Sequence, residues 1–265
     1  MGAEAAAGRR LNVAVDDLWQ VVGQLTNGLD GLAKQRKVRV VNGSGAFISS
    51  NELEVTSEGG SQVIRFEQCI IAAGSEPVSL PNTPEDPRIM DSTRALELEE
   101  LPQRLLVIGG GIIGLEMATV YEALGVSVSV VELTKTLIPA ADRDLVRSLE
   151  KRIRTRYESI MLGTGVTSME PGPEGITVRF EGEQAPAAPQ TYGRVLVAVG
   201  RRANGLEISA GAAGVRGGVQ PGDVPPVLGP SGHRWRQSAL PCVVRACSRR
   251  ALFPCENGCG HQMGT

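Results

Sequence analysis

The sequence predicts an α/β protein with a parallel sheet, and two observations carry this prediction. From residue 104 onward, apolar strand-like runs alternate with helical patterns and glycine turns, an order typical of parallel strands joined by helices on the faces of the sheet. Before that region, short β-rich runs separated by Gly, Ser and Asn turns indicate a small β-meander. The 265 residues are 42% hydrophobic, which is enough apolar content to bury a core in one large or two ordinary domains.

Charge and apolar content favour small-molecule chemistry. The net charge is -2 and the isoelectric point is about 5.9, so the chain lacks the basic character of nucleic-acid binders. Its first ten residues contain no apolar region of signal-peptide length, and no run approaches the roughly 18 apolar residues of a membrane span. We therefore expect a cytoplasmic protein with neither nucleic-acid nor membrane partners.

The first hundred residues contain one helical pattern followed by strand patterns. Asp16 and Asp17 precede apolar residues at spacings of three and four, which predicts an amphipathic helix ending near Lys34. The expected meander strands are residues 38–41, 46–48 and 53–56. Further apolar runs at 63–66 and 69–72 lead directly into Gly74, which we place at the end of a buried strand.

Four prolines between residues 77 and 87 cannot continue a helix or a central strand, so this stretch is a connecting segment with a domain boundary near Leu101. Beyond it the pattern predicts strands, helices and one hairpin in a regular order. The expected elements are a strand at 105–108, a helix at 112–124, a strand at 126–132, a helix at 142–157, a hairpin at 166–180 and a strand at 195–199.

A glycine motif occupies the first turn of this region. Residues 109–114 have the spacing G-x-G-x-x-G, which alone is a weak match. Here it follows an apolar strand, opens a helix and precedes Glu132, which ends the next strand 18 residues after Gly114. The agreement of strand, helix and acid favours a dinucleotide-binding βαβ unit of the Rossmann type, from about residue 104 to 132, over a glycine-rich turn of another α/β fold.

Each glycine of the motif has its own expected role. Gly109 permits the tight turn, Gly111 allows the backbone to approach a pyrophosphate, and Gly114 allows close packing of helix on strand. The phosphates would bind the N–H groups at the helix N-terminus, at Ile112 and Ile113, where the helix dipole favours negative charge.

Glu132 predicts a preference for NAD over NADP. Its carboxylate would accept hydrogen bonds from the adenosine ribose hydroxyls and would repel a 2′-phosphate, and no arginine follows closely to reverse this preference. Lys135 lies nearby, in a polar stretch where a lone lysine is more often solvated than bound to phosphate. Glu116, two residues past Gly114, is by position alone equally a surface residue or a cofactor contact.

Four segments in order resemble the pyridine nucleotide–disulfide oxidoreductases, and among them the dihydrolipoyl dehydrogenases. The likeness covers about residues 15–215. Its segments are Ile70-Ile71-Ala72-Ala73-Gly74-Ser75, Asp91-Ser92-Thr93, residues 104–116 around the glycine motif, and Val199-Gly200-Arg201-Arg202-Ala203-Asn204. The resemblance implies a flavoprotein that passes electrons from dihydrolipoamide through a disulfide and FAD to NAD, within a 2-oxoacid dehydrogenase complex.

The resemblance also implies further site residues. Val166 and Gly200 match positions that touch NAD in this family, and Glu116 matches the glutamate near the nicotinamide carboxamide. Ala73 and Gly74 match the strand end that approaches FAD. Together with the glycine motif, the expected cofactor-binding set is Gly109, Gly111, Ile112, Ile113, Gly114, Glu116, Glu132, Val166, Gly200, Ala73 and Gly74.

Several family features have no counterpart in this sequence. The glycine fingerprint for FAD and the Cys-x4-Cys redox pair do not precede Val15, and the family's dimerisation domain with its His-Glu acid–base pair does not follow. Cys242 and Cys247 have the redox spacing, but they lie at the wrong end of the chain and lack the glycine and helix pattern of the family. We therefore assign no catalytic residue and expect FAD to be held poorly, if at all.

The last fifty residues depart from the family altogether. Residues 216–265 are rich in Pro, Gly, Arg and Cys without helical or strand periodicity, a composition resembling a coding region read in a shifted frame. We expect this segment to be loosely packed, leaving the strand that ends near Ala73 without neighbours. Cys255, Cys259 and His261 have zinc-ligand chemistry together with Cys242 and Cys247, but no knuckle turn accompanies them, so we assign no metal site.

These observations divide the chain into three expected parts. Residues 1–100 are a partial FAD-binding domain with helix and meander, 101–205 are a Rossmann NAD-binding domain, and 206–265 are a short return segment and an irregular tail. The resulting interpretation is an incomplete dihydrolipoyl dehydrogenase-like oxidoreductase that retains NAD binding. Two alternatives are a non-catalytic NAD-binding module, and a zinc-binding or interaction fragment that acts through its Cys/His tail.

Overall fold

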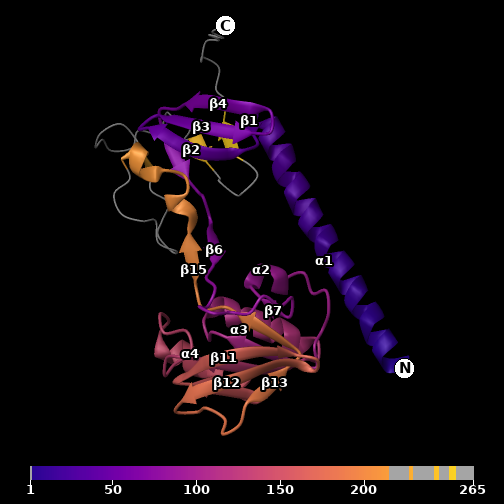
Figure 1. Ribbon diagram of the computed structural model, residues 1–265. Helices are drawn as coiled ribbons and strands as arrows, with labels where there is room; N and C mark the ends of the chain where they lie inside the picture. The colour runs from indigo at the N-terminus through magenta and orange to yellow at the C-terminus, as the bar shows by residue number, and fades with distance from the viewer. Residues whose placement is uncertain (1, 215–226, 229–241, 245–250, 255–265) are drawn as a thin grey trace. The chain divides into compact units, whose positions relative to one another are not determined.

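The computed structural model describes residues 2–214 and three short strands at 227–228, 242–244 and 251–254. Contacts divide the chain into two compact units, drawn in Figure 1. The first comprises Met1–Val15 and Pro77–Arg201, and the second Asp16–Glu76 and Arg202–Thr265. The domain bounds expected at residues 100 and 205 stay predictions.

A five-stranded parallel sheet forms the centre of the first unit, as the sequence predicts. Its strand order is β10-β9-β8-β14-β7, and all four neighbouring pairs are parallel. The strands are β7 (Ile89–Met90), β8 (Arg104–Ile108), β9 (Ser127–Glu132), β10 (Ser159–Leu162) and β14 (Arg194–Val197). The chain runs outward from β8 through β9 to β10 and then returns to the other side of β8, so the connection changes direction between β8 and β14.

The two faces of this sheet are covered differently. Helices α2 (Ser92–Ala95), α3 (Ile112–Ala123) and α4 (Arg143–Ile153) contribute to one core with Leu105 and Val107. Leu106 and Ile108 point to the opposite face, where the antiparallel sheet β11-β12-β13 packs. Its strands are β11 (Thr164–Gly172), β12 (Gly175–Gly182) and β13 (Gln190–Tyr192). The helices expected on the faces of the sheet therefore cover only one of them, because the chain between β10 and β14 contains strands, among them the hairpin predicted at 166–180.

Burial explains why the sequence clearly predicts β8, the strand that precedes the glycine motif. Leu105, Leu106 and Val107 are all fully buried, because alternate side chains of β8 enter the two cores. A parallel strand covered on both faces appears as a continuous apolar run. Each such side chain contributes on the order of 1.5–3 kcal/mol of stability, which fixes β8 and the turn that follows it.

The second unit contains a meander, of which two predicted strands, 46–48 and 53–56, form part. Strands β2 (Ser44–Ser49), β3 (Glu52–Ser57) and β4 (Gly60–Arg65) form an antiparallel sheet in chain order. The expected strand at 38–41 is wrong for this sheet, because β1 (Val38–Val41) pairs elsewhere and β4 supplies the third strand. Phe47, Leu53 and Val55 are buried on it, together with Cys69 and Ile71 of β5 (Cys69–Ile71).

The tail contributes strands that the sequence did not predict. Strand β5 lies between β16 (Val227–Leu228) and β17 (Cys242–Val244), while β1 (Val38–Val41) pairs with β18 (Ala251–Pro254). The expectation that the Cys69 strand lacks neighbours is therefore wrong, because its edges offer backbone donors and acceptors that short apolar runs can use. These strands are two to four residues long. The other predictions for residues 216–265 lie outside the described residues.

The N-terminal helix is longer than the sequence indicated. Helix α1 covers Gly2–Gln35, whereas the pattern predicted a start near Asp16. The difference arises because the Ala-rich stretch before Asp16 has high helix propensity but no apolar periodicity. Its apolar residues Leu18, Leu25 and Leu29 are exposed. No helix among the described residues is long and apolar enough to span a membrane.

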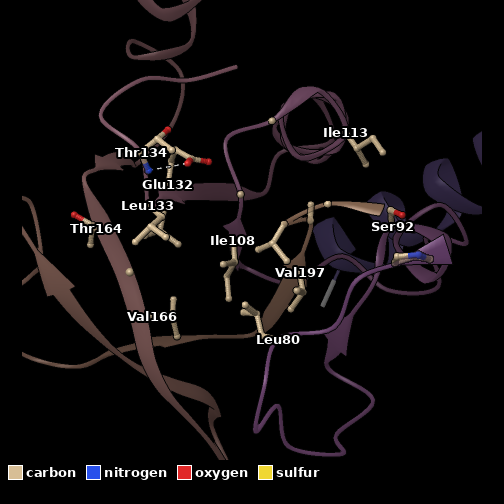
Figure 2. A pocket seen from close by; sticks show the side chains of 18 of the residues that line it. Leu80, Ser92, Ile108, Ile113, Glu132, Leu133, Thr134, Thr164, Val166 and Val197 are labelled. Carbon is tan, nitrogen blue, oxygen red and sulfur yellow. Dashed lines mark hydrogen bonds between the residues drawn. The ribbon is translucent and has the colours of Figure 1, made fainter. Parts of the chain in front are cut away.

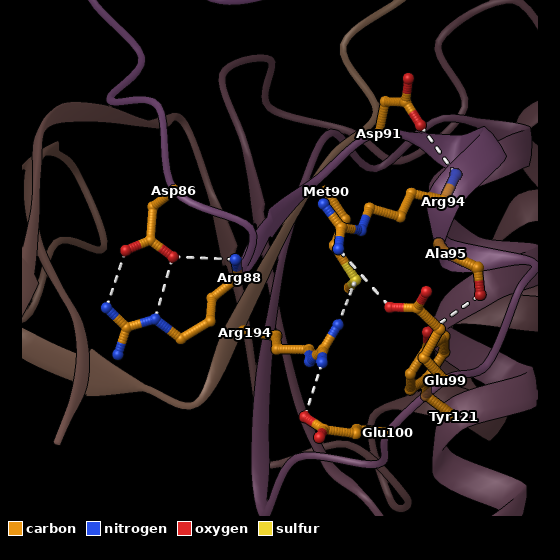
Figure 3. Close-up of polar contacts among 10 residues, drawn as sticks. All are labelled: Asp86, Arg88, Met90, Asp91, Arg94, Ala95, Glu99, Glu100, Tyr121 and Arg194. Carbon is orange, nitrogen blue, oxygen red and sulfur yellow. Dashed lines mark hydrogen bonds and ion pairs between the residues drawn. The ribbon is translucent and has the colours of Figure 1, made fainter. Parts of the chain in front are cut away.

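Arg88 forms an ion pair with Asp86 in the segment before β7 (Figure 3), and it also links this segment to the antiparallel sheet. Arg88 donates from Nε and Nη2 to the two carboxylate oxygens of Asp86, at 2.9 and 2.8 Å, and from Nη1 to the Gly172 carbonyl at 2.8 Å. The side-chain hydrogen bonds of Arg88, reinforced by its backbone N–H, lower the pKa of Asp86 from 3.8 to about 2. The charged carboxylate is therefore favoured by folding.

We expect Asp86→Asn to lower the free energy of unfolding by about 1 kcal/mol at pH 6, as for a well-aligned but partly exposed pair. Because the folded-state pKa is depressed, the contribution is complete above about pH 5 and is lost as the pH falls through the folded-state pKa of about 2. Urea unfolding of wild type and Asp86→Asn at pH 6 and pH 3 measures this difference in the free energy of unfolding. Glu99→Gln serves as the control, because Glu99 forms an exposed ion pair with Arg94. Equal differences between wild type and Asp86→Asn at both pH values would contradict the assignment.

Candidate functional site

A pocket of about 760 Å³ opens where the parallel sheet changes direction. Residues following β8, β9 and β14 meet at this edge, because the carboxyl ends of parallel strands lie together. Figure 2 shows Glu132 and Thr134 at one side of the pocket and Ser92 at the other, with Ile108 and Val197 between them. The site therefore lies entirely within the first unit.

The turn after β8 requires glycine for two separate reasons. Gly109 has a φ of +111°, and a Cβ there would lie 2.3 Å from the Ala198 carbonyl oxygen. A Cβ on Gly114 would lie 2.1 Å from the Gly109 carbonyl oxygen, so helix α3 sits directly against the turn. Both glycines thus allow a close approach that any other residue would prevent.

Gly111 differs from these two positions. It has a φ of -79°, which any residue can adopt, and no atom of the described part of the chain lies within 4 Å of a Cβ placed there. The space beside it belongs to the pocket. Folding therefore does not require glycine at this position, whereas a ligand lying on the backbone would.

The N-terminus of α3 faces the pocket without a capping side chain. Gly111 is the N-cap residue, no side chain caps it, and the first turn contains no acidic residue. Ile112 and Ile113 line the pocket directly after it. Backbone N–H groups at such a helix end, with the positive end of the helix dipole, form a site for an anion.

Glu132 is held in place by the backbone. Its Oε2 accepts a hydrogen bond from the Gly110 N–H at 2.7 Å. Its Oε1 accepts one from the Thr134 N–H at 2.8 Å, which Figure 2 shows. A carboxylate has about four acceptor positions, so roughly two remain for a ligand. The residue therefore links the glycine turn to the end of β9 and still offers acceptors to the pocket.

The structure brings together most of the residues predicted from the sequence. Those that line the pocket are Gly109, Gly111, Ile112, Ile113, Glu132, Val166 and Gly200. Gly114 lies buried behind the turn, and Glu116 is exposed on α3 and does not line the pocket. Ala73 and Gly74 belong to the second unit, where Gly74 follows β5 with a φ of +74°.

Sequence reasoning missed other lining residues, among them Ser92, Thr164, Glu181 and Arg201. Arg201 directly follows Gly200 beyond the end of β14, so its place at the sheet edge was available as a signal. Its Nη1 donates to the Ser92 hydroxyl at 3.3 Å. Among the residues that the structure describes, Arg201 is the one cationic residue that lines this pocket, alongside the acids Glu132 and Glu181.

No group of three or more His, Cys, Asp or Glu residues among the described residues is arranged to hold a metal ion. Cys69 is fully buried in the core of the second unit. The zinc alternative depends on Cys247, Cys255, Cys259 and His261, which lie outside the described residues.

A family model described as pyridine nucleotide-disulphide oxidoreductase matches residues 2–221. The chain belongs to this family. Membership confirms the resemblance inferred from the glycine motif and its neighbours. It also agrees with the parallel sheet and the added antiparallel strands of the structure.

Individual relatives within the family are similar over most of this chain. The dihydrolipoyl dehydrogenases of Vibrio cholerae and Haemophilus influenzae are 53% and 51% identical over 75% and 74% of the chain, which covers 42% and 41% of their lengths. The dihydrolipoyl dehydrogenase of Bacillus subtilis is 37% identical over 77% of the chain and 45% of its own length. The chain thus spans less than half of these relatives.

A solved structure is also similar to most of this chain. The HOCl-induced flavoprotein disulfide reductase RclA from Escherichia coli matches 77% of this chain and 46% of its own, with a TM-score of 0.66 and 27% sequence identity. The family name refers to a pyridine nucleotide, and the name of this member identifies a flavoprotein. At this level the expected cofactors, FAD and a nicotinamide nucleotide, agree with the family.

Proposed function

We propose that the chain binds NAD in the pocket beside β8, β9 and β14, as the nucleotide-binding part of a dihydrolipoyl dehydrogenase-like oxidoreductase. The observation that carries the proposal is the pairing of an uncapped helix N-terminus with open space at Gly111. An anionic ligand that lies flat on the backbone fits this arrangement, and a dinucleotide pyrophosphate is such a ligand.

Each residue that the sequence predicts for the NAD site then has a proposed role. Gly109 and Gly111 bring the backbone to the pyrophosphate, the N–H groups of Ile112 and Ile113 bind it, and Gly114 holds α3 against the turn. Glu132 accepts hydrogen bonds from the adenosine ribose and repels a 2′-phosphate, which selects NAD over NADP. We further propose that Val166 and Gly200 contact the nucleotide, and that Glu116 approaches the nicotinamide carboxamide.

The remaining assignments follow from the relatives. In the reaction of a dihydrolipoyl dehydrogenase, dihydrolipoamide and NAD would give lipoamide and NADH. In such an enzyme, Ala73 and Gly74 would approach FAD. We propose this substrate class, a 2-oxoacid dehydrogenase complex as partner, and a cytoplasmic location. For the chain itself we propose NAD binding without this turnover, because no residue of it matches the family's redox cysteines or acid–base histidine.

Titration of the purified full chain with NADH, followed by nucleotide fluorescence, tests the proposal. We expect saturable binding with a dissociation constant between about 1 µM and 1 mM, the usual range for such ligands. We also expect no visible flavin absorbance in the purified protein. Absence of NADH binding would contradict the proposed site, and bound flavin would contradict the interpretation as a nucleotide-binding part alone.

A further inference from the structure

A lysine–glutamate pair lies beside the Glu132 end of the pocket. Lys135 Nζ donates to Glu183 Oε1 at 2.6 Å, and the side chains are 76% and 63% exposed. Lys135 belongs to the loop after β9, and Glu183 directly follows β12. The hydrogen bond to Glu183 raises the pKa of Lys135, because the carboxylate favours the charged ammonium form.

Backbone hydrogen bonds connect this pair to Glu132. The Thr134 N–H donates to Glu132, the Gly163 N–H donates to the Thr134 carbonyl at 2.9 Å, and the Glu183 N–H donates to the Gly163 carbonyl at 3.1 Å. The two loops are thereby held side by side at one end of the pocket, where Thr134 and Glu181 are lining residues. Lys135 is therefore fixed within one residue of the pocket wall.

A 2′-phosphate on the adenosine ribose would enter this end, since Glu132 is the residue placed to meet the ribose. A nearby lysine or arginine favours recognition of such a phosphate, because its positive charge strengthens the hydrogen bonds to the phosphate oxygens. Arg201, the cation that lines the pocket, is hydrogen-bonded to Ser92, which Figure 2 shows across the pocket from Glu132. Lys135 is thus the cation suited by position to a 2′-phosphate, and Glu183 already occupies it.

We propose that Glu183 is a specificity-determining residue that withholds Lys135 from the 2′-phosphate of NADP. This inference rests on the proposed NAD function of the pocket. Glu183 acts in two ways: it occupies the lysine ammonium group, and it adds a negative charge next to the loop that follows Glu132. Loss of the Glu183 carboxylate would free Lys135 to approach a 2′-phosphate, without any change to the glycine turn.

Measured dissociation constants of NAD and NADP test this proposal in the full chain. We expect Glu183→Gln to raise the affinity for NADP relative to NAD about threefold at low ionic strength, the scale of a single exposed charge pair. The double variant Glu183→Gln with Lys135→Met should lose this gain, because the phosphate partner is then absent. High ionic strength should reduce the gain, because exposed charges are screened.

Glu170→Gln is the matched control. Glu170 pairs with Arg179 at 3.8 Å on the same hairpin and does not line the pocket, so this variant changes the net charge equally without freeing Lys135. An unchanged NADP-to-NAD ratio in Glu183→Gln, or an equal gain in Glu170→Gln, would overturn the proposal. A wild-type chain that binds no NAD would instead contradict the proposed function, and this inference would fail with it.

Discussion

Gly111→Ala is expected to weaken NAD binding at least tenfold, or about 1.4 kcal/mol, while leaving the stability of the free chain unchanged. The free chain has room for the added methyl group, since no atom of the described part of the chain lies within 4 Å of it and the φ of -79° suits alanine. The bound state does not have this room, because the methyl group would stand where the pyrophosphate must approach the backbone. Calorimetric titration and thermal unfolding of the same preparation measure both effects.

Gly114→Ala is the contrasting variant. Its added Cβ would lie 2.1 Å from the Gly109 carbonyl oxygen, so α3 must move away from the turn, at a cost of about 1–3 kcal/mol of stability. Although the two glycines are only three residues apart, we expect Gly111→Ala to reduce NAD affinity and Gly114→Ala to reduce stability. An unchanged NAD affinity in Gly111→Ala would contradict the proposal that the pyrophosphate binds at this turn.

Glu132→Arg is expected to shift the preference between NAD and NADP by roughly 1–3 kcal/mol, which is about fivefold to 150-fold in the ratio of dissociation constants. The substitution removes an acceptor from the ribose and replaces a repulsive charge by an attractive one. It also removes the acceptor of the Gly110 and Thr134 N–H groups, so a fall in thermal stability should accompany the change.

Glu132→Gln serves as the control for that structural effect. The amide retains one acceptor oxygen for the backbone and lacks the negative charge, so its preference should fall between those of wild type and Glu132→Arg. If Glu132→Arg alters stability but leaves the NAD-to-NADP ratio unchanged, the residue supports the turn and does not meet the ribose.

The parts of the fold predicted from sequence are those where local pattern and burial agree. Residues 105–108 and 126–132 appear as strands because both faces of the sheet are covered, and β8 and β9 match them closely. The helix expected at 112–124 likewise matches α3 at Ile112–Ala123. Strand β7, only two residues long, has no periodicity to detect and is defined by its pairing with β14.

In the candidate site, too, the sequence predicts contacts within a local motif but not contacts between residues that are far apart in the chain. The glycine turn and Glu132 belong to one local motif, so their spacing alone predicts that they meet. Ser92 and Arg201 meet across 109 residues of chain, and Lys135 and Glu183 across 48, which no local pattern encodes. The tail strands illustrate the same limit, because their pairing with β1 and β5 depends on open sheet edges elsewhere in the chain.

A crystal structure of the full chain with NAD tests the central claim most directly. We predict that the pyrophosphate lies on the backbone at Gly111, within hydrogen-bond distance of the N–H groups at the start of α3. We also predict that an adenosine ribose hydroxyl donates to Glu132. Nucleotide density at another place, with the turn between β8 and α3 empty, would contradict the account.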